Sequence, residues 1–230
     1  MISDSLTSIK NKIASTCKKN GRNPEEITLI AVTKNISLEK IEEVLNLGIK
    51  NIADNKVQEA LSKYSSLKEK FKTNPFYWHM IGHLQTNKVK DAVGLFDLIH
   101  SVDSLRLAIE INKQAAKINK IQDILIEVNT SGETTKFGIK PQSVIEIIKE
   151  IAKLKNINVK GLMTIAPLVD NPEKTRNFFR KLKELIKEFN ERRIANDELR
   201  ILSMGMSDDY QVAIEEGSTM IRLGRAIFAN

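Results

Sequence analysis

Cysteine and long apolar runs are almost missing from this sequence. The chain has 230 residues and one cysteine, Cys17, so no disulfide can form within it, and a reducing cytoplasm is the expected environment. No window approaches the roughly 18 consecutive apolar residues of a membrane span, and the polar start of the chain lacks a signal-peptide core. We therefore expect a soluble cytoplasmic protein that has no contact with a membrane.

Glycine and proline are also sparse, with 10 and 5 residues, and no Pro/Gly/Ser-rich linker or low-complexity segment divides the chain. A hydrophobic content of 41% at this length suits one large domain over residues 1–230. The first apolar run is not followed by G-x-G-x-x-G, which weighs against a doubly wound dinucleotide-binding fold.

The net charge of +7 raises the question of an anionic partner. The Lys-rich segments, such as KEKFK and RKLKELIKEF, interleave Glu with Lys at the spacing of solvated helix faces. Aromatic-basic alternation, zinc-ligand spacing and a helix-turn-helix signature are all lacking. We expect no nucleic-acid partner, whereas a phosphorylated small molecule remains compatible with this charge.

Eight short apolar runs alternate with amphipathic helical patterns, and this alternation indicates parallel strands joined by helices. Eight strands in one domain favour an α/β fold of the (β/α)8 TIM barrel type over an open sheet. A further helix over about residues 2–19 precedes the first strand and is expected on the bottom or side of the barrel. The predicted strands are residues 28–33, 51–53, 78–81, 98–102, 124–129, 159–165, 200–204 and 220–223.

Polar side chains follow several of these strands, and functional groups in such barrels lie at the C-terminal strand ends. Lys34 ends the apolar run ITLIAV, where a buried strand has no local need of an ammonium group. The segments SMGMS and RLG follow the seventh and eighth strands, the usual place for a phosphate site. Ser207 is expected to offer its hydroxyl and a helix N-terminus to an anion there.

A lysine amine opposite a phosphate site, with an arginine beside it, points to pyridoxal 5'-phosphate as cofactor. Arg222 is the candidate partner of the cofactor's ring nitrogen. An arginine cannot accept the ring proton, so the pyridine would stay unprotonated and withdraw electrons weakly. Chemistry through a fully developed carbanion is then disfavoured.

The stretches AVTKN, NKVQEA, WHMIGHLQTNK, VNTSGETTKFGI, GLMTIAP, LSMGMSDD and AIEEGSTMIRLGRAIF occur in this order across residues 28–228. Together they resemble the pyridoxal phosphate homeostasis protein family. Members look like the N-terminal barrel of alanine racemase, a fold-type III pyridoxal phosphate protein, and bind the cofactor through a Schiff base. The resemblance implies Lys34 as the Schiff-base lysine, Asn55 near the ring hydroxyl, Arg222 near the ring nitrogen, and Ser207 with the Gly224 and Arg225 backbone around the phosphate.

The sequence departs from the family pattern at three of these places. Ile36 stands where the family often has a second lysine, and Asp54 replaces a glutamate. Arg225 replaces a threonine, which removes a hydroxyl from the phosphate site and adds a positive charge. Lys136, in TTKFG, matches another family lysine and is the best candidate for a second amine.

The segment WHMIGH invites a metal interpretation, because His79 and His83 are four residues apart. Residues 78–81 nevertheless read as a strand, which separates the pair, and no acidic third ligand is evident. We therefore expect no metal site. His83 and Met204 are candidates for lining the barrel mouth.

The function expected from these residues and from the resemblance is storage, shielding or delivery of pyridoxal phosphate through a reversible Schiff base on Lys34, with little or no catalysis. An amino-acid racemase is the alternative, but racemisation needs two bases, and alanine racemase takes the second from another domain, which 230 residues cannot accommodate. A barrel aldolase acting on a sugar phosphate through Lys34 is a third reading. The expected partners are the cofactor and pyridoxal phosphate-dependent apoenzymes, and we expect a monomer.

Overall fold

The structure is a computed structural model that describes residues 1–192 and 198–229, and eight parallel strands form a closed barrel at its centre. Each strand pairs with its neighbours in sequence, and β8 closes the barrel by pairing with β1. The predicted eight-stranded α/β barrel is therefore confirmed. The strands are Thr28–Val32 (β1), Asn51–Asp54 (β2), Tyr77–Met80 (β3), Leu98–Val102 (β4), Gln122–Glu127 (β5), Ile157–Met163 (β6), Ile201–Ser203 (β7) and Met220–Leu223 (β8).

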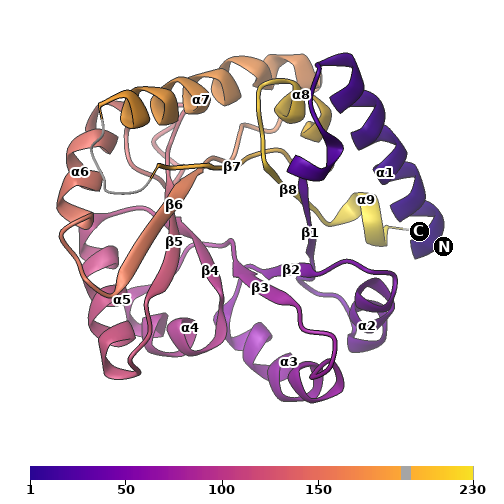
Figure 1. Ribbon diagram of the computed structural model, residues 1–230, viewed down its shortest axis with the longest axis horizontal. Helices are drawn as coiled ribbons and strands as arrows, with labels where there is room; N and C mark the ends of the chain where they lie inside the picture. The colour runs from indigo at the N-terminus through magenta and orange to yellow at the C-terminus, as the bar shows by residue number, and fades with distance from the viewer. Residues whose placement is uncertain (193–197, 230) are drawn as a thin grey trace.

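Helices surround the barrel, as Figure 1 shows. None of the described helices combines the length and apolar character that crossing a membrane requires. The α-helices are Ile2–Lys19 (α1), Leu38–Asn46 (α2), Val57–Lys70 (α3), Val89–Leu95 (α4), Leu105–Lys117 (α5), Val144–Ile151 (α6), Arg176–Glu191 (α7), Tyr210–Glu215 (α8) and Arg225–Phe228 (α9). Short 3-10 helices in the described ranges precede a strand or a helix: Pro24–Glu26 (η1), Thr86–Lys88 (η2), Pro141–Ser143 (η3) and Pro172–Thr175 (η4).

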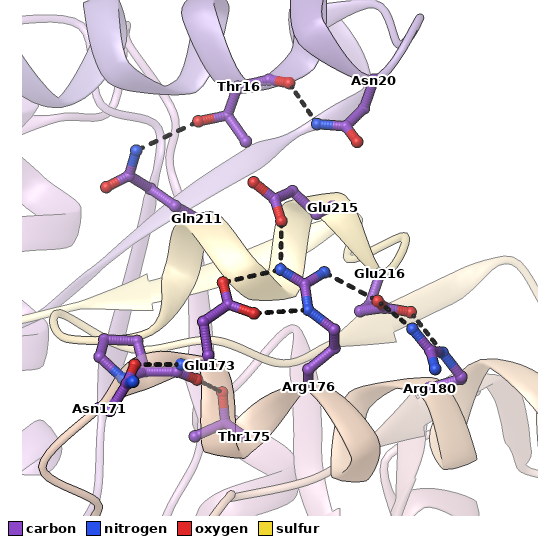
Figure 2. Close-up of polar contacts among 11 residues, drawn as sticks. Thr16, Asn20, Asn171, Glu173, Thr175, Arg176, Arg180, Gln211, Glu215 and Glu216 are labelled. Carbon is purple, nitrogen blue, oxygen red and sulfur yellow. Dashed lines mark hydrogen bonds and ion pairs between the residues drawn. The ribbon is translucent and has the colours of Figure 1, made fainter.

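The N-terminal helix α1 packs on the side of the barrel, against α8 and α9. Its buried residues recur at helical spacing and so form one apolar stripe. At the C-terminal end of this stripe, the Gln211 amide of α8 donates a hydrogen bond to the Thr16 hydroxyl over 3.3 Å (Figure 2). The stripe consists of Ile2, Leu6, Ile9, Ile13 and Cys17.

Side chains alternate along the strands between the helix-facing core and the barrel interior. In β8, Ile221 and Leu223 belong to the core under the helices, whereas Met220 and Arg222 point inward. Leu98, Leu125 and Met163 form a small apolar cluster in the interior. The buried polar side chains of the interior are His79, His100, Glu127, Ser203 and Arg222.

The predicted strand bounds are exact for β4 and β8 and are shifted elsewhere. β5 begins earlier than predicted, at Gln122, because this polar residue is fully buried and its amide donates to the Asp97 and Asp123 carbonyls over 3.0 Å each. β5 also ends earlier, at Glu127, and Val128 after it forms an isolated bridge to Ile139.

Arg176, the first residue of α7, joins the loop after β6 to α8 (Figure 2). Its guanidinium lies 2.8 Å from Glu173 in η4, 2.6 Å from Glu215 and 2.9 Å from Glu216. Arg180 adds a further contact of 3.0 Å to Glu216. Because several charges share one network, this cluster stabilises more than an isolated surface pair would.

β6 and β7 approach each other closely at Gly161, where a larger residue would not fit. A methyl group at this residue would lie 2.7 Å from the Ile201 carbonyl carbon and closer still to its oxygen. We predict that Gly161→Ala lowers the free energy of unfolding by at least about 2 kcal/mol, because the strands must separate.

Gly94→Ala is the matched control, since Gly94 lies in α4 with no atom within 4 Å of the added carbon. Helix propensity should leave this variant unchanged or up to about 1 kcal/mol more stable. Urea denaturation followed by circular dichroism measures both values, and equal stability of the two variants would contradict the tight strand contact.

Candidate functional site

A cavity of about 440 Å³ opens at the C-terminal end of the barrel. Residues after seven of the eight strands or in the loops that follow them line it, all except β4, as expected for this fold. The predicted site residues in its wall are Lys34, Asn55, Lys136, Ser207, Arg222, Gly224 and Arg225.

Lys34 is the first of the two central residues of a tight turn directly after β1. The turn is closed by a hydrogen bond of 3.1 Å from the Ile36 amide to the Thr33 carbonyl. Asn35, the second central residue, has φ of 57°, a left-handed conformation that asparagine tolerates better than most residues. The Lys34 side chain is exposed, and its amine has no hydrogen bond or ion pair with another described residue. The amine is thus free to react with a ligand in the cavity.

Arg222 reaches the same cavity from β8 and is 3% exposed. Its guanidinium donates to the Ser203 hydroxyl over 2.7 Å and to the Thr164 carbonyl over 2.9 Å. Burial lowers the pKa of Arg222 to about 10, while Asp209 and Glu127 act in the opposite direction. The guanidinium is therefore charged at neutral pH and can only donate hydrogen bonds.

A chain of hydrogen bonds runs from Arg222 across the barrel interior. The Ser203 hydroxyl lies 2.9 Å from His100 Nδ1, and His100 Nε2 lies 2.9 Å from His79 Nδ1. His79 Nε2 lies 3.0 Å from the side-chain oxygen Oδ1 of Asn51, which completes the chain. Burial lowers the pKa of His79 to about 4 and that of His100 well below its usual value, so both rings are neutral.

The two ends of this chain fix the position of each proton. The Asn51 oxygen can only accept, so His79 carries its proton on Nε2 and accepts from His100 at Nδ1. His100 then carries its proton on Nε2 and accepts from Ser203, which itself accepts from Arg222. All donors thus point one way, and the chain holds the Arg222 guanidinium in place without adding charge.

Glu127 is a second buried ionisable group near Arg222, at the end of β5. Its carboxylate has no hydrogen bond with another described residue. Burial and the charge of Asp103 raise its pKa to about 7, although Arg222 acts to lower it. Near neutral pH this side chain therefore exists in both protonation states.

The loops after β7 and β8 meet on the far side of the cavity from β3. The Ala226 amide donates to the Ser207 hydroxyl over 3.2 Å, and the Arg225 guanidinium pairs with Asp208. The extra positive charge of Arg225 is thus partly neutralised. The expectation that Ser207 begins a helix is wrong, because α8 starts at Tyr210 with Asp209 as its N-cap.

Asn55 contributes an unsatisfied polar atom to the cavity wall. Its side-chain oxygen is buried and has no hydrogen-bond partner among the described residues. The backbone of Asn55 packs directly on Gly82, where an added Cβ would lie 2.8 Å from Asn55 Cα. A buried amide held in this way is poised to bond a polar group of a ligand.

Lys136 lies on the loop after β5, on another side of the cavity. The Asn129 side chain shapes this loop by donating to the Glu133 and Lys136 carbonyls over 2.9 and 3.2 Å. The Lys136 amine is 3.9 Å from the Glu133 carboxylate. Ile36, which stands in place of the family's second lysine, packs against the hydrophobic core instead.

Two predicted lining residues do not border this cavity. Met204 is fully buried in the hydrophobic core between the barrel and its helices, because Ser203, the residue before it, points into the barrel. His83 borders a neighbouring hollow of about 380 Å³, where it stacks on Phe137 at 3.9 Å and bonds Asp103 at 3.1 Å. In the part of the chain that the structure describes, no three His, Cys, Asp or Glu side chains are grouped as a metal would require.

Sequence reasoning missed Glu127, His100 and Lys63. Glu127 ends an apolar run, DILIE, just as Lys34 does, so the same signal would have found it. His100 interrupts the buried strand LIHSV. Lys63 gave no signal, because a lysine four residues after a glutamate in a helix is typical of solvated faces.

The fold and the site define a class of protein: a (β/α)8 barrel in which a lysine, an arginine and the loops after β7 and β8 surround one cavity. The profile of the family "Alanine racemase, N-terminal domain" matches residues 6–230. An alanine racemase structure from Clostridium difficile has the same fold, with a TM-score of 0.72, 18% identity, and coverage of 98% of this chain and 56% of that one.

Two further comparisons identify the family within this class. The pyridoxal phosphate homeostasis protein of Aquifex aeolicus is 45% identical over 223 residues, which cover 97% of this chain and 95% of the relative. The structure of PipY from Synechococcus elongatus with pyridoxal phosphate bound has a TM-score of 0.83 and 30% identity, with coverage of 99% and 100%. The chain belongs to the pyridoxal phosphate homeostasis protein family.

The raised pKa of Glu127 predicts a pH-dependent stability. The ordinary value is 4.5, so between this pH and about 7 the folded protein holds a proton that the unfolded chain has released. The free energy of unfolding therefore falls as the pH rises through this range. Glu127→Gln removes the titration, so its stability relative to wild type should rise by roughly 3 kcal/mol between about pH 5 and pH 8.

Urea denaturation of the wild type and of Glu127→Gln between about pH 5 and pH 8 measures the difference between their free energies of unfolding. The contributions of the other titrating groups are common to both proteins and cancel in this difference. Parallel pH profiles of the two proteins would show that Glu127 titrates normally.

Proposed function

We propose that this protein binds pyridoxal 5'-phosphate in the C-terminal cavity and acts in the homeostasis of that cofactor, by storage, shielding or delivery. One observation supports this most: the Lys34 amine, the Asn55 amide, the Arg222 guanidinium and the loops after β7 and β8 all line one cavity. These groups correspond to the aldehyde, ring hydroxyl, ring nitrogen and phosphate of the cofactor. We further propose that residues 1–230 act as one cofactor-binding domain.

The residues present fit the cofactor. The orphaned oxygen of Asn55 is a buried polar atom that a polar group on the ring would satisfy. Arg222 has further N–H groups, besides the two bonded to Ser203 and Thr164, that can donate to an acceptor in the cavity. It remains charged, since its pKa is about 10. Ser207 and Arg225 supply a hydroxyl and a cation beside the phosphate position, and Gly224 leaves space for close backbone approach.

The cofactor supplies an aldehyde that condenses reversibly with amines. In our proposal the Lys34 amine attacks this carbon, and the aldehyde oxygen leaves as water. Because Lys34 is exposed and the cavity is open, water or another amine can reverse the attachment without any opening of the barrel. Lys136, on the other side of the cavity, is proposed as a second amine.

Little or no catalysis is proposed, and Arg222 is the reason. Since a guanidinium donates a hydrogen bond to the ring nitrogen but does not protonate it, the ring withdraws electrons only weakly. Amino-acid racemisation is the alternative, and a turnover assay with the cofactor-loaded protein distinguishes the two. Pyridoxal phosphate-dependent apoenzymes are the proposed recipients, and the protein is proposed to act as a monomer.

Lys34→Ala tests the attachment site. The variant should lose the visible absorbance of lysine-bound cofactor, because no amine remains at the turn. It should still retain some cofactor non-covalently, with a dissociation constant raised about tenfold or more, because Arg222 and the phosphate loops are intact.

Titration with pyridoxal phosphate, followed by absorbance and by equilibrium dialysis, gives both quantities. Lys136→Ala is the matched control and should keep the wild-type band. A Lys34→Ala spectrum identical to that of wild type would reject the assignment.

A further inference from the structure

A buried ion cluster lies directly behind the turn that carries Lys34. It consists of Asp54 at the end of β2 together with Glu59 and Lys63 from α3. The three side chains are 0%, 20% and 8% exposed. None of the three lines the cavity that Lys34 enters.

The Lys63 ammonium group is fully saturated by this cluster and by the turn. It donates to Asp54 Oδ1 over 3.1 Å, to Glu59 Oε1 over 2.8 Å and to the Thr33 carbonyl over 2.9 Å. Since an ammonium has three protons, no donor is left for a ligand. The other Asp54 oxygen accepts from the Trp78 indole over 3.0 Å. The cluster thus has no spare donor, and its contacts lead to the backbone next to Lys34.

Glu59 reaches the other side of the same turn. Its Oε1 atom accepts from the Asn35 amide over 2.6 Å as well as from Lys63. The cluster therefore bonds the carbonyl of the residue before Lys34 and the amide of the residue after it. Bonds from Lys63 and Asn35 outweigh the effect of burial and lower the pKa of Glu59, which keeps the acceptor ionised.

We propose that Glu59 and Lys63 are positioning residues that fix the direction in which the Lys34 side chain enters the cavity. The two peptide groups flanking Lys34 are each bonded to the cluster, and the second of them leads into the left-handed Asn35. Rotation of either peptide would swing the Lys34 Cα–Cβ bond away from the cavity. The inference rests on the proposed attachment of the cofactor to Lys34.

The step that this positioning serves is condensation of the amine with the aldehyde. A carbon–nitrogen double bond replaces the carbon–oxygen double bond of the aldehyde, and the oxygen leaves as water with the two protons of the amine nitrogen, so that no oxidant or reductant takes part. Positioning accelerates such a step because the amine is already in place for attack. It contributes nothing to a ligand without an aldehyde, and this difference separates positioning from a structural role.

Three substitutions of Glu59 separate geometry from charge. Glu59→Gln keeps the reach and an oxygen acceptor for Asn35, Glu59→Asp keeps the charge but draws the acceptor back, and Glu59→Leu removes both. We expect condensation of pyridoxal phosphate, followed by stopped-flow absorbance, to slow about tenfold or more in the Leu and Asp variants and only slightly in the Gln variant. A purely electrostatic role reverses the order, with Asp nearer to wild type than Gln.

Binding of pyridoxine 5'-phosphate, which has an alcohol in place of the aldehyde, is measured for each variant and should stay within about twofold of wild type. Lys120→Met is the matched control, because Lys120 is a half-buried lysine that donates to the Val93 and Phe96 carbonyls over 2.8 Å each, next to β5 at the N-terminal end of the barrel. It should condense at the wild-type rate.

Condensation at the wild-type rate in Glu59→Asp or Glu59→Leu, or a loss of pyridoxine phosphate binding that parallels the rate, would overturn the positioning role. Failure of the underlying proposal looks different: the wild-type protein itself would then show no condensation that Lys34→Ala abolishes, and both proposals would fall together.

Discussion

The pairing of β8 with β1 is the constraint on which the site depends. Ile30 of β1 lies in register with Arg222 of β8, so the two ends of the chain are brought together only when the barrel closes. Lys34 and Arg222 then border one cavity, although nearly the whole chain separates them in sequence. The loops after β6 and β7 complete the cavity, and the Arg176 network ties the loop after β6 to the C-terminal end of α8.

The interior of the barrel combines an apolar cluster with a buried polar chain. Leu98, Leu125 and Met163 form the cluster, and two neutral histidines and one serine link Arg222 to Asn51. A buried guanidinium needs such acceptors, because leaving its donors unpaired would cost several kcal/mol. Glu127 is the exception, since its carboxylate is buried near Arg222 without a hydrogen bond to another described residue, and its pKa is raised to about 7.

The sequence predicts the barrel and the Lys34–Arg222 pair because each of these residues interrupts an apolar run at a strand end. The same reasoning fails for Met204, since adjacent strand residues face opposite sides and Ser203 takes the inward place. It fails for Lys63 because the Glu59–Lys63 spacing is that of a solvated pair, and only the packing of α3 behind the first turn buries it. Neighbouring strands or the loops after them carry Asp103, Glu127 and His100. The contacts of these residues depend on how the strands are aligned with each other, and a local sequence pattern does not predict this alignment.

The central claim is that Lys34 is the amine that carries the cofactor. Borohydride reduces a carbon–nitrogen double bond to a stable single bond, so it locks the cofactor onto whichever lysine holds it. The most direct measurement is peptide mass mapping of the protein after loading with pyridoxal phosphate and reduction. The account predicts that the cofactor mass appears on the peptide that contains Lys34, whereas a label on Lys136 or another lysine with Lys34 unmodified would contradict it.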